Sequence, residues 1–274
     1  MVTVPLTLLY LLDNISADAK PARVSTNALA FFLHLIMSEV HFVNCTPLAE
    51  ETLAKIARVS NPQNENNNKT APQLIRYMWD HAHYSPFEMA DMTLEILTTR
   101  AISPQILRHG KGFSFQEFSQ RYSNINKIGR IETPQLRAQD PKNRQNSTND
   151  LQQKIGKPAL ADLQRKVAIH LEEAGHLYQE LVSNGVALES ARYILPLAAP
   201  TRLYMKGPLR SWIFYIALRT DPSTQIEHRV LAEAAKDIFI EQFPILSEAM
   251  GWFSTELLVK EIMSTDGVTV SPNP

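Results

Sequence analysis

A stripe of apolar residues at helical spacing, between residues 160 and 182, constrains the fold more than any other feature of the chain. Its members are Leu160, Leu163, Val167, Leu171, Ala174, Leu177, Tyr178 and Leu181. Apolar side chains that recur every three or four residues predict one long amphipathic helix with a single face against the rest of the protein. Gly185 follows the stripe and supplies a C-terminal stop, because glycine readily adopts the left-handed conformation there.

Other segments predict further helices and one strand. Residues 90–99 alternate apolar Met92, Leu94 and Ile96 with polar Thr93 and Glu95, which is typical of a half-buried strand. Helices are expected over residues 48–59, 73–81, 209–218 and 224–243. A helix-rich α+β domain with a small antiparallel sheet fits this order of elements best.

A short helix is expected directly after the strand. Ser103 and Pro104 match an N-cap residue followed by proline at the first helical position. The helix would carry Gln105, Arg108 and His109. Because Gln105 and Arg108 are three residues apart, we expect both side chains on one face of this helix.

The chain divides into an appendage, a domain and a tail. Residues 1–37 contain two apolar runs, 4–12 and 28–37, each too short to span a bilayer, which needs about 20 residues. A methionine at the end of this segment offers a second start position, so we interpret residues 1–37 as an N-terminal appendage. Docking of its apolar runs on a partner is the alternative. The folded domain is expected over residues 38–262 and a flexible tail over residues 263–274.

Composition limits the function classes. The 274 residues carry a formal net charge of −1, which argues against a general nucleic-acid binder, since such proteins neutralise many phosphates. The only cysteine, Cys45, excludes a disulfide within one chain and is expected to be a small buried residue rather than a nucleophile. His81 and His83 lack a nearby cysteine and an HExxH spacing, so no metal site is expected. We expect a cytoplasmic protein that binds neither nucleic acid nor membrane.

Positive charge is concentrated in one segment, residues 97–131. It contains six cationic side chains and a single acidic residue, Glu117. The six are Arg100, Arg108, Lys111, Arg121, Lys127 and Arg130. Gly110 and Gly112 allow close backbone approach, and neighbouring serines, glutamines and a histidine add hydrogen-bonding groups. This set suits an anionic planar ligand such as a nucleotide, although a basic loop that faces water is the competing interpretation.

Three arginines outside this segment, Arg192, Arg210 and Arg219, lie among apolar neighbours. A partly buried guanidinium needs an anion or hydrogen-bond acceptors, so each arginine is a candidate ligand-binding group. Internal ion pairing, for example between Arg192 and Glu189, is the alternative for any one of them.

Over about residues 40–250 the sequence resembles the flavin-dependent thymidylate synthase (ThyX) family. The resemblance rests on several motifs in a fixed order. The first are His83-Tyr84-Ser85-Pro86-Phe87-Glu88, Gln105-Ile106-Leu107-Arg108-His109, and a Ser-x-x-Glu-x-Ser-x-Arg-Tyr motif at residues 114–122. Later matches are Ala191-Arg192 before Leu195-Pro196, Leu209-Arg210-Ser211-Trp212, Leu218-Arg219, and Gln225 with Glu227.

The resemblance implies a ThyX-like α+β fold and a methyltransferase that acts on dUMP. Such enzymes methylate dUMP at C5 to give dTMP, with 5,10-methylenetetrahydrofolate as the carbon donor. FAD, reduced by NADPH, provides the hydride, and no cysteine nucleophile is needed. The family assembles as a homotetramer whose active sites are shared between subunits.

The resemblance also assigns roles residue by residue. The dUMP-binding positions are Gln105, Arg108, Glu117, Ser119, Gln120, Arg121, Arg192 and Arg219. Of these, Ser119 to Arg121 would hold the phosphate from a neighbouring subunit. Arg219 is the expected catalytic residue, because a guanidinium near the uracil ring would favour ionised N3 and polarise the base. The FAD-binding positions are His83, Ser85, Glu88, Arg108, His109, Glu117 and Arg210.

Three departures from the family pattern fall on the flavin side. The family's Arg-His-Arg is Arg108-His109-Gly110 here, and the loop over residues 110–113 is longer than usual, with two glycines that should loosen it. Pro208 replaces an asparagine, and Phe214 stands where a histidine or asparagine contacts FAD. The predicted function is an active synthase. The alternative is a non-catalytic relative that binds dUMP but binds FAD poorly.

Overall fold

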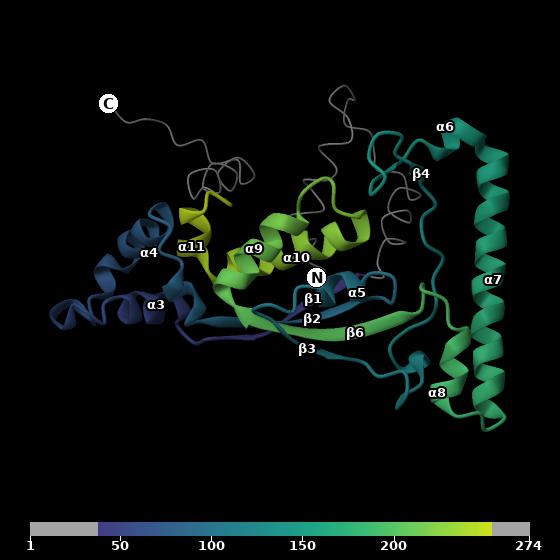
Figure 1. Cartoon of the computed structure of the whole chain (residues 1–274), viewed down its shortest axis with the longest axis horizontal. Helices are drawn as coiled ribbons and strands as arrows, with labels where there is room; N and C mark the ends of the chain where they lie inside the picture. Colours follow the sequence, from purple (N-terminus) through teal and green to yellow (C-terminus); the bar gives the residue numbers. More distant parts are fainter. Residues whose placement is uncertain (1–37, 254–274) are drawn as a thin grey trace, which may run out of the picture.

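The computed structural model describes residues 38–253, which fold around a four-stranded antiparallel sheet (Figure 1). The strands lie in the order β1–β2–β6–β3. Their bounds are β1 Glu39–Cys45, β2 Asp91–Thr99, β6 Pro200–Pro208 and β3 Ser114–Glu117. The expected appendage over residues 1–37 and tail over residues 263–274 lie outside the described residues.

The two central strands, β2 and β6, pair antiparallel along their full length. Every second residue of β2 is buried, as its alternating sequence predicted. The buried apolar side chains of the two strands are Met92, Leu94, Ile96, Leu203 and Met205. They form the centre of the core, and the prediction of a small antiparallel sheet in a helix-rich α+β domain is confirmed.

Two helices, α9 Leu209–Arg219 and α10 Ile226–Gln242, lie over one face of the sheet (Figure 1). Strand β6 ends at Pro208 and α9 begins at the next residue, so no loop separates them. The backbone N–H of Leu209 donates to the carbonyl of Ala90, the residue before β2, at 2.9 Å. The buried indole of Trp212 donates to the carbonyl of Met92, also at 2.9 Å. These bonds fix α9 to the edge of β2, and both predicted helices are confirmed.

The two ends of the sheet carry separate groups of helices. At one end lie α3 Ala49–Ala57, α4 Ala71–Asp80 and α11 Pro244–Ala249, of which the first two were predicted (Figure 1). At the other end lie α6 Leu151–Ile155, α7 Lys157–Ser183, α8 Leu188–Ala191 and the hairpin of β4 Ala138–Gln139 with β5 Ser147–Thr148. Short 3-10 turns are η1 Pro62–Asn64, η2 Asn68–Thr70, η3 Ser85–Glu88, η4 Ile125–Lys127 and η5 Arg192–Ile194.

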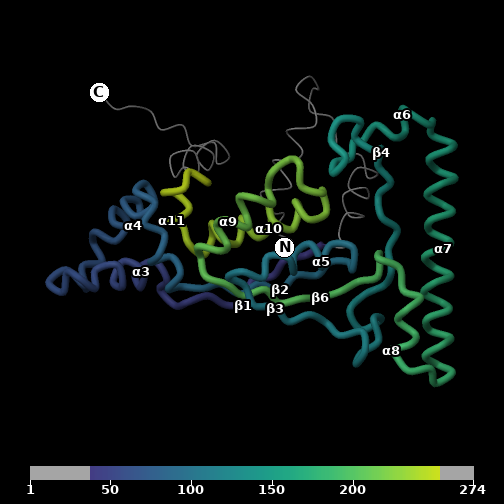
Figure 2. The backbone as a smooth tube through the Cα atoms, in the orientation of Figure 1, coloured from purple at the N-terminus to yellow at the C-terminus, as the bar shows by residue number. Residues whose placement is uncertain are grey.

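Helix α7 is the long helix that the apolar stripe predicted, and Figure 2 shows it at the end of the molecule beside α8. Gly185, at φ +83°, accompanies its end as expected. Tyr178 packs in a small cluster with Ile125, Ala191 and Ala199. Much of the stripe is nevertheless uncovered in one chain, because Leu163 and Leu177 are 44% and 46% exposed.

The sequence did not reveal β1, β3 or β6, and it placed the short helix α5 Ser103–Leu107 imperfectly. Helix α5 ends before Arg108, so Arg108 and His109 lie beyond it rather than on it. Ser103 does not cap the helix, because its hydroxyl donates to Oε1 of Glu117 at 2.5 Å. The carboxylate is the stronger acceptor for that hydroxyl, and this contact ties α5 to β3.

Candidate active site

Helix α9 carries two of the predicted arginines at its opposite ends. Arg210 lies in the first turn and Arg219 is the last residue. With a rise of 1.5 Å per residue, the two are roughly 14 Å apart along the helix axis. Two groups of predicted site residues gather near these two ends.

Arg219 is hydrogen-bonded to His109, with Nε of the arginine donating to Nε2 of the histidine at 2.9 Å. Arginine only donates hydrogen bonds, so Nε2 of His109 accepts and its ring proton sits on Nδ1. Burial and then the neighbouring Arg219 hold the pKa of His109 below its ordinary value. Both the hydrogen bond from Arg219 and the lowered pKa therefore indicate that the His109 ring is neutral.

Tyr215 and His228 lie behind this pair, and the sequence had assigned a role to neither residue. The ring of Tyr215 meets His109 edge-on at 4.9 Å between centroids, and a 3.1 Å hydrogen bond joins its Oη to Nε2 of His228. His228 is fully buried, and its pKa falls to about 3 through burial, with Arg219 and His109 adding to the effect. Burial raises the pKa of Tyr215. Tyr215 precedes Arg219 by four residues, a helical spacing that was visible in the sequence.

The loop over residues 110–113 is anchored by Phe113. Its ring meets Trp212 edge-on at 5.0 Å and Tyr215 at 6.0 Å between centroids. Gly112, at φ +85°, lies so close to the side chain of Ser211 that a Cβ there would be 2.2 Å from Oγ. Close packing on α9 thus constrains Gly112 and Phe113, whereas Gly110 has open space beside it.

Glu117 of β3 holds three segments together through one carboxylate oxygen. Oε1 accepts from Nη1 of Arg100 at 2.5 Å, from the hydroxyl of Ser103 at 2.5 Å and from the hydroxyl of Thr201 at 3.0 Å. Its carboxylate is largely enclosed, with 19% of the side chain exposed. A predicted ligand residue thus has a clear positioning role within the chain.

The residues expected at the phosphate follow β3 and lie beside α8. The backbone N–H of Arg121 is 3.4 Å from Oγ of Ser119, and its guanidinium pairs with Glu189 of α8 at 3.4 Å. Glu189 thus pairs with Arg121, where the sequence had suggested Arg192 as its partner. The buried Nε2 of Gln120 has no hydrogen-bond partner among residues 38–253. An unused donor next to Arg121 in the sequence suits an anionic ligand.

Four of the residues expected at FAD, His83, Ser85, Glu88 and Arg210, lie near the start of α9, whereas His109 lies at its other end beside Arg219. Glu88 of η3 pairs with Nη1 of Arg210 at 2.5 Å, and both side chains are about half exposed. His83 and Ser85 are exposed in the same segment, between α4 and β2. An open hollow of about 400 Å³ adjoins the pair. Its lining includes Glu88, Gly112, Phe113, Lys206, Gly207 and Pro208.

The three departures from the family pattern gather around this region. The Gly112–Phe113 segment and Pro208 line the hollow, and Phe214 of α9 meets Tyr84 edge-on at 5.9 Å. A Cβ on Gly207 would lie 2.4 Å from the Phe113 ring, so a glycine is required for the loop to approach β6. The longer loop over residues 110–113 thus packs closely on β6 because residue 207 of that strand has no side chain.

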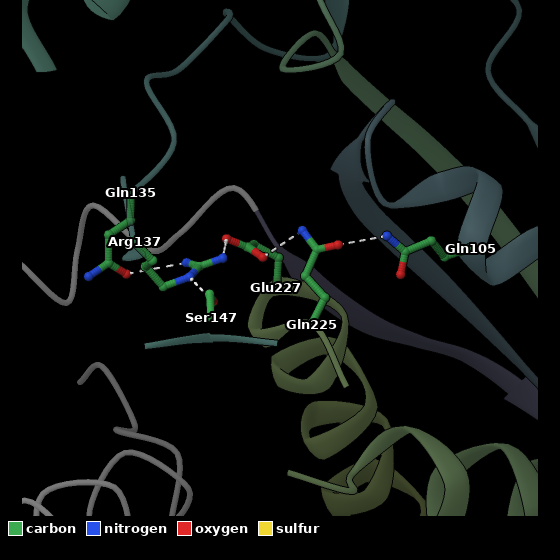
Figure 3. A network of polar contacts seen from close by, with 6 residues as sticks. All are labelled: Gln105, Gln135, Arg137, Ser147, Gln225 and Glu227. Carbon is green, nitrogen blue, oxygen red and sulfur yellow. Dashed lines mark hydrogen bonds and ion pairs between the residues drawn. The ribbon is translucent and has the colours of Figure 1, made fainter. Parts of the chain in front are cut away.

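Gln105 belongs to a polar network that also includes Gln225, Glu227 and Arg137 (Figure 3). The last three line a cavity of about 230 Å³. Gln225 and Glu227 were singled out as motif positions without a role, whereas Arg137 was missed, because nothing in its own segment suggested a partner on α10.

Arg108 is exposed at the end of α5, and Arg192 is partly buried in η5. Within residues 38–253, no group of three or more His, Cys, Asp or Glu side chains is placed to hold a metal ion. In the same residues, no helix combines the length and apolar character needed to cross a membrane.

The sequence matches a known family profile, described as "Thymidylate synthase complementing protein", over residues 41–245. A probable flavin-dependent thymidylate synthase of Paramecium bursaria Chlorella virus 1 is 47% identical over 207 residues, which cover 74% of this chain and 91% of that protein. A flavin-dependent thymidylate synthase of Synechocystis is 47% identical over 222 residues, which cover 81% of this chain and 98% of that protein.

Among solved structures, the chain is similar to PolB from Streptomyces cacaoi, a UMP/dUMP methylase bound with 5-Br dUMP. The two are 26% identical with a TM-score of 0.63, over 79% of this chain and 95% of that chain. The fold is therefore similar to that of a dUMP methylase, and most of the sequence is similar to flavin-dependent thymidylate synthases.

Proposed function

Because this chain belongs to the family of flavin-dependent thymidylate synthases, we propose that it converts dUMP to dTMP by reductive methylation at C5. 5,10-Methylenetetrahydrofolate supplies the carbon, NADPH and a proton supply the reducing equivalents, and the hydrogen at C5 leaves as a proton. FAD supplies the hydride when bound. The observation that carries this proposal is the 47% identity to the Synechocystis enzyme over 98% of that enzyme's length.

Arg219 is the proposed catalytic residue. Its Nε is committed to His109, which leaves the two terminal amino groups of the guanidinium as donors for the uracil ring. Two donors fixed beside the base stabilise negative charge at N3 and the carbonyl oxygens, and this makes C5 more electron-rich. His109 orients Arg219, and it does so as an acceptor only while its ring is neutral.

Binding of dUMP would use the basic segment. Three consecutive residues suit the phosphate: Ser119 offers a hydroxyl, Gln120 an unused amide donor and Arg121 a guanidinium. Arg192 adds a second guanidinium from η5. Arg108 and Gln105, together with Glu117, would complete the nucleotide site.

The residues around the start of α9 fit FAD. Arg210 and Lys206 would supply cations for a diphosphate that displaced their present partners, Glu88 at 2.5 Å and Asp91 at 3.1 Å, and the hollow of about 400 Å³ gives room beside Lys206. Glu88, His83 and Ser85 add hydrogen-bonding groups at its edge. The donor set is thus appropriate for the cofactor even though Gly110 and Pro208 depart from the family pattern.

A non-catalytic dUMP-binding protein is the second candidate. One observation favours it: Pro208 and the Gly112–Phe113 segment line the hollow beside Glu88, near four of the residues expected at FAD. In that case the dUMP-binding residues would still bind dUMP, whereas FAD would bind weakly.

Titration with FAD, followed by anaerobic addition of NADPH, separates the two candidates. An active synthase binds FAD, and NADPH bleaches the flavin absorbance; dTMP then forms when dUMP and methylenetetrahydrofolate are supplied. Binding of dUMP without binding of FAD would support the non-catalytic candidate. Reduced flavin that yields no dTMP would overturn the proposed reaction while leaving the flavoprotein assignment.

We further propose a cytoplasmic homotetramer with active sites shared between subunits. The uncovered apolar face of α7 supports an assembly, since Leu163 and Leu177 are each more than 40% exposed in one chain. Light scattering after size exclusion should give four times the 31.0 kDa chain mass. A monomer at micromolar concentration would contradict the assembly without touching the proposed reaction.

A further inference from the structure

A chain of hydrogen bonds leads from the β4 side of the molecule to Gln105 of α5 (Figure 3). Nη2 of Arg137 donates to Oε1 of Glu227 at 2.6 Å. The other carboxylate oxygen, Oε2, accepts from Nε2 of Gln225 at 2.9 Å. Oε1 of Gln225 in turn accepts from Nε2 of Gln105 at 2.7 Å. We call these four residues the amide chain.

The direction of every bond in the amide chain is fixed by its charged end. A guanidinium only donates, and an ionised carboxylate only accepts. Gln225 must therefore turn its NH₂ group to Glu227 and its carbonyl oxygen to Gln105. Gln105 must then offer its own NH₂ group to Gln225.

The charged end is itself held in place. The side chain of Arg137 is 11% exposed, and its Nε donates to the hydroxyl of Ser147 at 2.8 Å. Its Nη1 lies 3.5 Å from Oε1 of Gln135 (Figure 3). Because a guanidinium bound from several directions has little freedom to rotate, Glu227 is anchored rather than loosely paired.

One atom at the far end of the amide chain remains available. Oε1 of Gln105 accepts no hydrogen bond within residues 38–253, although its Nε2 is engaged. Gln105 follows β2 on α5 and precedes the exposed Arg108 by three residues. The amide chain thus presents a carbonyl oxygen from the segment that also carries Arg108 and His109.

We propose that the amide chain orients Gln105 so that its carbonyl oxygen accepts a hydrogen bond from dUMP. This assignment rests on the proposed function, since dUMP is its ligand. Apart from its phosphate, dUMP has two donors, N3–H of the base and the 3′-hydroxyl of the sugar. Gln105 is the binding residue, and Arg137, Glu227 and Gln225 are positioning residues that act through it.

Glu227→Gln is the sharpest variant, because it keeps the shape of the side chain and removes the group that sets the direction. A glutamine at that position can donate to Gln225 as well as accept from it. Gln225 and then Gln105 are free to reverse, and Gln105 presents an NH₂ group to the donor on dUMP. Loss of one hydrogen bond of this kind weakens binding about tenfold.

A double-mutant cycle tests the proposal, with dUMP affinity measured by calorimetry on the full chain. Glu227→Gln and Gln105→Ala should each weaken dUMP binding about tenfold, and the double variant should also lose about tenfold, not a hundredfold. Glu233→Gln is the matched control, since it breaks an ion pair with Arg229 on the same helix and should leave dUMP affinity unchanged. Additive losses, or no loss in Glu227→Gln, would overturn the amide chain as a positioning device.

A second ligand identifies the donor. With 2′,3′-dideoxyuridine monophosphate, disappearance of the Glu227→Gln loss assigns the 3′-hydroxyl, whereas persistence of the loss assigns N3–H. If the native chain binds no dUMP at all, the proposed substrate fails and this assignment fails with it. If the native chain binds dUMP and the losses are additive, only the amide chain is refuted.

Discussion

Nε of Arg219 donates to Nε2 of His109 at 2.9 Å, which joins the last residue of α9 to the segment that follows α5. The bond takes one of the three guanidinium nitrogens and fixes the plane in which the other two lie. It also fixes the tautomer of His109, because arginine cannot accept a hydrogen bond. A residue expected at FAD therefore orients the residue expected at the uracil ring.

Replacement of Arg219 should separate chemistry from flavin binding. In the proposed reaction Arg219→Ala removes both donors to the base, so turnover should fall by about a hundredfold or more, as on removal of a donor to developing charge. FAD affinity should change far less, since Arg210 and Glu88 lie at the other end of α9. Single-turnover rates and FAD titrations measure the two effects, and equal losses in both would show that Arg219 is structural.

His228 should make the protein sensitive to acid. Its pKa is about 3 in the folded protein, against about 6.5 when unfolded. Between these values the unfolded chain binds a proton that the folded chain does not, so unfolding becomes easier as pH falls. The loss from this residue approaches about 1.4 kcal/mol per pH unit and begins below pH 6.5.

His228→Gln keeps a hydrogen-bonding partner for Tyr215 and removes the titration. Urea unfolding at a series of pH values should show a smaller stability loss between pH 6.5 and 4 than in the native chain. His170→Gln, at an exposed position of α7, is the matched control and should follow the native curve. Parallel curves for His228→Gln and the native chain would mean that His228 is not buried in a neutral form.

The same substitution should have opposite effects at two glycines. Gly207→Ala places a Cβ 2.4 Å from the Phe113 ring and 2.7 Å from the carbonyl oxygen of Gly112, so the loop must move. Overpacking of this kind costs about 1–3 kcal/mol. Gly175→Ala, inside α7, meets only Ile131 at 3.7 Å and should gain up to about 1 kcal/mol from helix propensity.

Thermal melts of the two glycine variants provide the comparison, with FAD titration of each as a second measurement. Gly207→Ala should also weaken FAD binding, because the hollow beside Glu88 is lined by the displaced loop. A Gly207→Ala variant as stable as the native chain would contradict the close packing of this loop.

Restoring the family arginine should strengthen FAD binding. Gly110 has space for a side chain, since the nearest atom to a Cβ there is the Leu107 carbonyl oxygen at 3.8 Å. Gly110→Arg adds a charged donor near the flavin-binding residues, and one such bond corresponds to about 1 kcal/mol, or about fivefold in affinity. Gly110→Gln is the uncharged control. Equal FAD affinities in all three proteins would show that Lys111 already supplies the charge.

The elements that the sequence revealed are those with an internal period. Residues 160–182 and β2 show their helical and alternating patterns within the segment itself, so both were predicted. Strand β6 alternates Leu203 and Met205 with polar residues, a signal that was present but shortened by Pro200 and Gly207. Strand β3 has only four residues inside the basic segment and depends on pairing with β6, which no local pattern announces.

The site followed the same rule. Motif positions such as Arg219 and Gln105 were identified from their order along the chain, but their partners were not. His228, Tyr215 and Arg137 acquire their roles from neighbours that are distant in sequence, and the sequence of α10 does not show that its histidine is buried. The packing of the loop over residues 110–113 was missed for the same reason, because Phe113 contacts Trp212, which lies nearly a hundred residues later.

The most direct test of the proposed reaction is tritium release from dUMP labelled at C5. The assay contains the full chain, methylenetetrahydrofolate, NADPH and added FAD. The proposed function predicts release of tritium to water that requires both FAD and methylenetetrahydrofolate and that falls in Arg219→Ala. Absence of release from folded protein at saturating FAD, with dUMP bound, would contradict a synthase and leave a nucleotide-binding protein.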